Sequence, residues 1–120
     1  MTGDELIALS KERGLIADRL FLMMSYASDG DTEAVMQHLP EHLAYWDEME
    51  QRKAMFVAGP LIPADQSDDF SGEGIVVISA PSYQEAKEIA DEDPMHKAGV
   101  REFELRPWLL NHMNTDALST

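Results

Sequence analysis

Apolar residues follow strand-like and helical spacings in turn, and these spacings predict the elements of the chain. Continuous runs that are apolar on both faces, such as Leu20 to Ala27 and Ile75 to Ala80, are typical of buried strands. Apolar residues three and four apart, bounded by capping residues or proline, predict helices. The expected strands span residues 19–27, 55–58, 74–80 and 100–106, and the expected helices span 2–14, 40–53 and 82–93, with a further helical turn over 33–37.

The order of these elements predicts the fold. After a leading helix, one βαβ unit follows another, which is the split βαβ order of an α+β, ferredoxin-like (βαββαβ) domain. Helices cover only one face of such a sheet, yet the strands at 19–27 and 74–80 are apolar on both faces. A second copy of the chain is the simplest cover, so we expect a homodimer with its two sheets face to face. The domain is expected over residues 19–110, with an N-terminal helical extension over 1–18 and a polar tail over 111–120.

Local residue chemistry sets the expected ends of several elements. Ser82 and Glu85 form the pattern of a capping box at the start of the second long helix. Pro94 is expected to end that helix and Pro107 to end the last strand. Alternation along this strand places Arg101, Phe103 and Leu105 on one face and Glu102, Glu104 and Arg106 on the other.

Two polar residues are predicted on inward faces of the helices. His42 lies within the apolar stripe of helix 40–53, and Asp93 continues the buried spacing of Ala86 and Ala90. Buried polar groups need partners, so His42 and Asp93 are candidates to meet. A carboxylate that binds one imidazole nitrogen fixes the tautomer and makes the other nitrogen more basic, as a general base requires. The alternative is a core histidine that an aspartate satisfies for purely structural reasons.

Composition and spacing argue against several other functions. The formal charge of −14 repels nucleic acid and anionic lipid, and the lack of cysteine removes disulfides, a thiolate nucleophile and cysteine-rich zinc sites. His38 and His42 are four residues apart, but Pro40 between them argues against a helical metal site. His96 and His112 are expected in a loop or tail, exposed to solvent. With no glycine-rich phosphate loop either, we expect no metal and no cofactor, and the lack of a membrane-spanning run or basic leader predicts a cytoplasmic protein.

Several short motifs, taken in order, resemble the landmarks of the YciI-like (YCII-related) family over residues 20–109. They are Pro40-Glu41-His42-Leu43-Ala44-Tyr45, Ala58-Gly59-Pro60-Leu61, Gly74 at a strand start, Asp93-Pro94 with Ala98-Gly99, and Arg106-Pro107-Trp108. The resemblance implies a dimeric α+β barrel and a His–Asp pair in a cleft, at His42 and Asp93. It also implies that the chain is related to a dehydrochlorinase of an aromatic ring-cleavage pathway. Leu39 stands where a basic residue is often seen, and the leading helix lies outside the usual domain.

The function we expect is that of a small cofactor-independent lyase or isomerase. His42 would move a proton on a small aromatic-derived or lactone-like substrate, and Asp93 would orient His42. The expected substrate-binding residues are the apolar walls Tyr26, Trp46 and Phe56, the turn residues Gly59 and Pro60, and Arg106, which could meet a substrate carboxylate. The alternative is a non-catalytic small-ligand-binding or interaction module with the same dimeric fold.

Overall fold

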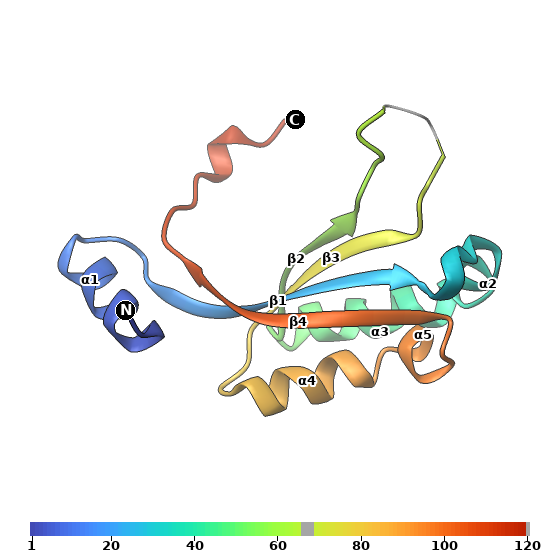
Figure 1. Cartoon of the computed structure of the whole chain (residues 1–120), viewed down its shortest axis with the longest axis horizontal. Coiled ribbons are helices and arrows are strands. Elements are labelled where there is room, and N and C mark those ends of the chain that lie inside the picture. Colours follow the sequence, from blue (N-terminus) through green and yellow to red (C-terminus); the bar gives the residue numbers. More distant parts are fainter. Residues whose placement is uncertain (66–68, 120) are drawn as a thin grey trace.

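The computed structural model describes residues 1–65 and 69–119, built around one four-stranded antiparallel sheet of order β2-β3-β1-β4 (Figure 1). The strands are β1 (Asp18–Ala27), β2 (Met55–Pro60), β3 (Glu73–Ile78) and β4 (Arg101–Leu110). The α-helices are α1 (Gly3–Glu12), α2 (Thr32–Gln37), α3 (Leu39–Gln51), α4 (Tyr83–Asp91) and α5 (Pro94–Lys97), and short 3-10 turns span Ser28–Gly30 and Thr115–Ala117. This βαββαβ order with a leading helix confirms the α+β, ferredoxin-like fold.

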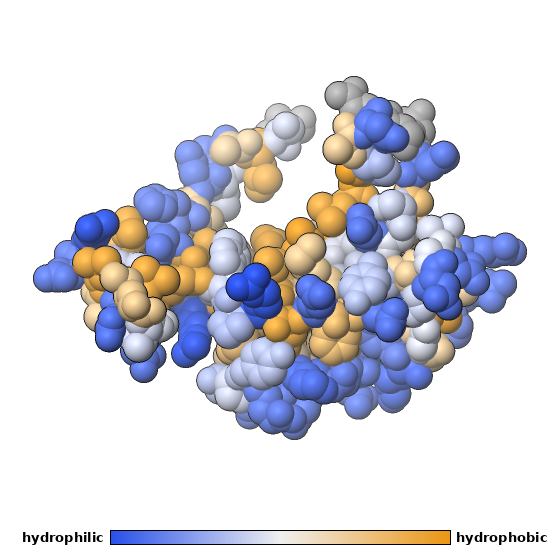
Figure 2. Space-filling view, in the orientation of Figure 1, coloured by the Kyte–Doolittle hydropathy of each residue, from blue (hydrophilic) through white to orange (hydrophobic). Residues whose placement is uncertain are grey.

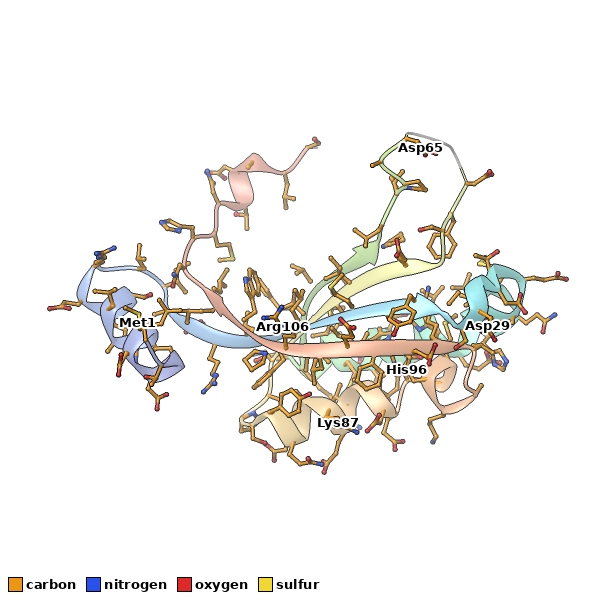
Figure 3. The ribbon with its side chains drawn as sticks, viewed as in Figure 1. Met1, Asp29, Asp65, Lys87, His96 and Arg106 are labelled. Carbon is orange, nitrogen blue, oxygen red and sulfur yellow. The ribbon has the colours of Figure 1, made fainter. Side chains whose placement is uncertain are left out.

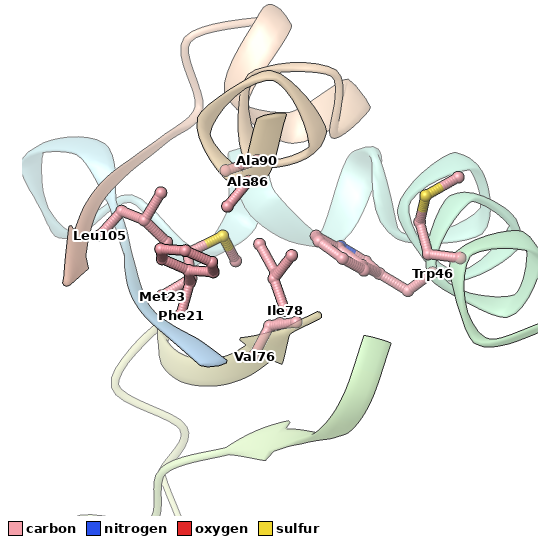
Figure 4. Close-up of a cluster of buried hydrophobic side chains, with 9 residues drawn as sticks. Phe21, Met23, Trp46, Val76, Ile78, Ala86, Ala90 and Leu105 are labelled. Atoms are coloured by element: carbon pink, nitrogen blue, oxygen red, sulfur yellow. The ribbon is translucent and has the colours of Figure 1, made fainter. Parts of the chain in front are cut away.

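Helices α3, α4 and α5 cover one face of the sheet, and α1 lies apart from them beyond one end (Figure 1). The main core fills the layer between the sheet and these helices (Figure 4). Phe21 and Met23 of β1 and Ile78 of β3 meet Ala86 and Ala90 of α4 there, each at most 3% exposed. Tyr45 of α3 donates a hydrogen bond to the Ile89 carbonyl at 2.6 Å, which ties α3 to α4.

The opposite face of the sheet, which we call the open face, is covered by none of the described helices. Strand alternation and register place on it Leu20, Leu22, Met24 and Tyr26 of β1, Val57 of β2, Ile75 and Val77 of β3, and Glu102, Glu104, Arg106, Trp108 and Leu110 of β4. Residues 61–65 and 69–72, which follow β2 and precede β3, rise beside it, as do residues 111–119, and Figure 2 shows a hollow between the two parts with hydrophobic side chains at its base. Met24 and Val57 remain 42% and 48% exposed there.

Helix starts follow the capping chemistry of the sequence. The Ser82 side chain accepts a hydrogen bond from the Glu85 amide at 3.1 Å, as predicted. The Glu85 carboxylate, however, accepts from the Ser82 hydroxyl at 3.3 Å rather than from the Ser82 backbone, so the predicted reciprocal box is only half formed. A full capping box joins Thr2 and Glu5 at the start of α1.

One of the two predicted proline stops was wrong. Strand β4 continues through Pro107 to Leu110, because β4 is an edge strand and a residue without an N–H is tolerated there. The stop at Pro94 is confirmed, because α4 ends at Asp91, before the proline. Pro94 then opens a separate short helix, α5, with Asp93 as its N-cap. In the described part of the chain, no helix is long and apolar enough to cross a membrane.

Candidate active site

His42 of α3 and Asp93, the N-cap of α5, are hydrogen bonded to each other. His42 Nδ1 lies 2.8 Å from Asp93 Oδ2 and 3.1 Å from Oδ1. The residues are 51 positions apart in sequence, and the packing of α3 against α5 brings them together. The predicted His–Asp pair is therefore present.

Asp93 is the centre of a small hydrogen-bond network. Its carboxylate is fully buried and also accepts from Trp46 Nε1 at 2.8 Å and from the Met95 amide at 2.9 Å. Burial by itself would raise the pKa of Asp93, but the hydrogen bonds from His42, Trp46 and Met95 outweigh it and hold that pKa below the ordinary aspartate value. Asp93 is thus an ionised acceptor in the interior.

The ionised carboxylate determines the tautomer of His42. Because a carboxylate can only accept, Nδ1 carries the proton of this hydrogen bond. His42 Nε2 then holds the free lone pair, and no other described residue forms a hydrogen bond with it. The side chain is 20% exposed and lines a cavity of about 650 Å³ between α2–α3 and the β2–β3 side of the sheet. The pair therefore presents a basic nitrogen at a mainly apolar cavity.

The structure brings only some of the predicted substrate-binding residues to this cavity. Trp46, Gly59 and Pro60 line it. Tyr26 and Arg106 lie on the open face instead, because their even positions in β1 and β4 point away from the helices. Phe56 is 41% exposed at a β-bulge between Met55 and Val57, and it does not line the cavity either.

Three polar residues that were not predicted as site residues form a second cluster beside the pair. Ser25 of β1 and Arg101 of β4 line the same cavity and are 6% and 8% exposed. His96 contacts Ser25, with Nε2 2.9 Å from the hydroxyl. The expectation that His96 is an exposed loop residue was wrong, because α5 folds its ring against the sheet. The inward position of Arg101 beside Phe103 and Leu105 was the one sequence signal for this cluster.

The donor set does not resemble a metal centre. Within residues 1–65 and 69–119, no group of three His, Cys, Asp or Glu side chains is arranged to hold a metal ion. The oxygens of Asp93 are already taken by N–H donors. What the arrangement can do is accept a proton at His42 Nε2.

One protein-family model matches most of this chain. The model of the YCII-related domain matches residues 19–109. The chain belongs to the YCII-related family. No curated protein gives a significant match to this YCII-related chain.

A solved structure shares the fold of this YCII-related protein. It is the 5-chloro-2-hydroxyhydroquinone dehydrochlorinase from Burkholderia phenoliruptrix AC1100, in complex with 2,5-dihydroxybenzoquinone. The match has a TM-score of 0.64 and 24% identity, and it covers 74% of this chain and 92% of that one. At this identity the similarity establishes a common fold.

Proposed function

We propose that this protein is a small cofactor-independent lyase or isomerase in which His42 accepts a proton from a small aromatic-derived or lactone-like substrate. The observation that carries the proposal is the His42–Asp93 hydrogen bond at 2.8 Å, which leaves Nε2 as the free nitrogen of a ring that lines the cavity. His42 would take the proton at Nε2 and return it to the product or the leaving group. Asp93 holds the ring in this tautomer and stabilises the imidazolium that forms.

The substrate class follows from the cavity and from the structural neighbour. A volume of about 650 Å³ suits a small molecule, and Trp46, Leu39 and Met55 give the cavity an apolar wall. The neighbouring dehydrochlorinase is in complex with a small ring compound, 2,5-dihydroxybenzoquinone. Of the six residues that the sequence suggested for substrate binding, we therefore propose Trp46, Gly59 and Pro60 as substrate-binding residues. Tyr26, Phe56 and Arg106 are not assigned to this cavity.

We further propose that two copies of the chain meet through their open faces. Met24, Tyr26, Val57 and Trp108 are 38–48% exposed on this face although they belong to regular strands. Several large apolar side chains exposed on one face of a sheet are typical of an interaction site. A second copy presents a matching sheet, which makes an isologous homodimer the natural occupant.

The function is tested with His42→Gln, which keeps size and some hydrogen bonding but removes the base. The assay is turnover, followed by absorbance and by chloride release, on a panel of hydroxylated and chlorinated ring compounds that includes 5-chloro-2-hydroxyhydroquinone. We expect His42→Gln to lose roughly 10²-fold or more in kcat, the scale of a positioned general base. His38→Gln is the matched control, because His38 lies one turn earlier and does not line the cavity. Equal turnover in both variants would contradict a base role for His42.

A binding function without turnover is the second candidate, and one observation favours it. Asp93 also caps α5 and accepts from Trp46, so the pair has a structural role that needs no chemistry. Binding of ring compounds with no turnover of any of them would support this alternative.

A further inference from the structure

Ser25, His96 and Arg101 form a continuous hydrogen-bond chain next to the proposed site. Arg101 Nη1 lies 3.3 Å from Ser25 Oγ, and Ser25 Oγ lies 2.9 Å from His96 Nε2. His96 Nδ1 lies 2.6 Å from the Ala90 carbonyl. The chain thus joins β4, β1 and α5 on the helix-covered side of the sheet, where Figure 3 shows His96.

Every proton in this chain has a defined position. The Ala90 carbonyl only accepts, so His96 Nδ1 donates to it and Nε2 must accept from the Ser25 hydroxyl. Burial lowers the pKa of His96, in keeping with a neutral ring. Because Ser25 donates its proton to His96, its oxygen is left to accept from Arg101. The cluster therefore holds the Arg101 guanidinium in one orientation.

Arg101 has more donors than the protein uses. Nη1 also donates to the Gly72 carbonyl at 2.9 Å, and Nε lies 3.3 Å from Met95 Sδ. No carboxylate forms an ion pair with Arg101 in the part of the chain that the structure describes, and no described residue accepts a hydrogen bond from Nη2. The ionised Asp93 acts electrostatically on Arg101, but no described carboxylate is in contact with the guanidinium, which is 8% exposed. A buried charge without a directly bound counter-ion is costly, since buried charges are normally paired.

We infer that Arg101 is the anion-binding residue of the cavity and that the substrate carries an anionic oxygen, such as a carboxylate, an enolate or an acidic ring hydroxyl. Arg101 and His42 line the same cavity, so one small molecule can meet both. Ser25 and His96 are positioning residues that act through Arg101. The inference rests on the proposed function for the identity of the site, but it concerns binding and needs no turnover to be tested.

The test compares two probes that differ in charge. 2,5-Dihydroxybenzoquinone is a vinylogous acid and is anionic at neutral pH, whereas its dimethyl ether has the same ring without the charge. Affinities are measured by calorimetry. The wild type should prefer the anion, and Arg101→Met should weaken anion binding about ten- to hundredfold, as expected when a charged hydrogen bond is lost. Binding of the ether should change less than about twofold by the same reasoning.

Matched variants separate this role from others. Arg106→Met removes an arginine from the open face of the same strand and should leave both affinities unchanged. Ser25→Ala should lower the anion-to-ether preference by about three- to tenfold without changing ether binding, the scale of one neutral hydrogen bond. A purely structural Ser25 would shift both probes together.

Several results would overturn the inference. One is a folded Arg101→Met that binds the anion as the wild type does, and another is a wild type that binds the anion no better than the ether. If Arg101→Met does not fold, Arg101→Lys replaces it in the test, because lysine keeps the positive charge but lacks the two parallel N–H donors of the guanidinium. Anion affinity should still fall several-fold in this variant. His42→Gln should retain the anion preference, so a failure of the base role and a failure of the anion site give different results.

Discussion

Asp93→Asn tests how much of the stability depends on the buried network around this carboxylate. The substitution keeps the shape of the side chain and replaces one oxygen by an NH₂ group. Oδ2 accepts from Trp46 and His42, while Oδ1 accepts from the Met95 amide and more distantly from His42. Whichever oxygen the amide nitrogen replaces, it faces an N–H donor, and either Trp46 or Met95 loses its acceptor.

The magnitude follows from these contacts. A buried donor left without an acceptor costs about 1–3 kcal/mol, and the remaining bonds lose the charge that strengthens them, which adds roughly 1 kcal/mol. We therefore expect Asp93→Asn to lower the free energy of unfolding by about 2–4 kcal/mol near neutral pH. This is a large share of the ~5–15 kcal/mol that typically stabilises a domain.

The loss should depend on pH in a defined direction. The pKa of Asp93 is lowered in the folded state relative to its ordinary value of 3.8. Ionised Asp93 therefore stabilises the fold fully above that value, and this contribution disappears as the pH falls through the folded-state pKa. The gap between wild type and Asp93→Asn should be widest near neutral pH and should narrow under acid conditions.

Urea unfolding followed by far-UV circular dichroism, at one fixed protein concentration, measures the difference. Asp91→Asn is the matched control. Asp91 is a carboxylate two residues before Asp93, at the end of α4, but it forms an exposed i,i+4 ion pair with Lys87 at 2.8 Å. It should cost less than about 0.5 kcal/mol. An Asp93→Asn variant that is no less stable than Asp91→Asn would refute the network as a source of stability.

Two further predictions concern the backbone near Arg101 and the open face. Gly72→Ala should lower the free energy of unfolding by about 2–4 kcal/mol, since φ is +84° and a Cβ would lie 2.7 Å from Ala27 Cβ. Gly99→Ala is the control and should cost only about 1 kcal/mol, because φ is +75° but no atom lies within 4 Å of a Cβ there. Equal costs in urea unfolding would show that Ala27 moves aside without a cost in stability. Light scattering at micromolar concentration should give the mass of a dimer, and Trp108→Glu should shift it toward monomer; a folded wild-type monomer would argue against contact through the open face.

Local spacing was enough to predict most of the fold. The apolar strand runs, the helical stripes and the capping residues act within a few positions of one another, so each element could be placed from its own residues. The same local logic placed His42 and Asp93 on inward faces of their helices, and inward polar groups need a partner. With both residues inward, their contact was open to prediction across 51 positions.

Tertiary structure decided which elements are neighbours, and the local errors have this origin. Pro107 continues β4 because the strand order leaves β4 at an edge. Tyr26 and Arg106 miss the cavity because β1 and β4 turn these positions to the open face. Alternation in β4 already placed Arg106 on the charged face, opposite Phe103 and Leu105. In β1, which is apolar on both faces, nothing distinguishes the face of Tyr26 from the face that meets the helices.

The cluster around Arg101 shows the same division. The sequence of β4 placed Arg101 on the inward face of that strand, the face of Phe103 and Leu105. Only the register of β1 against β4 and the fold of α5 brought Ser25 and His96 to it. Periodicity determines the face that a side chain occupies on its own element, whereas the partner it meets depends on strand order and register, which are set by contacts distant in sequence.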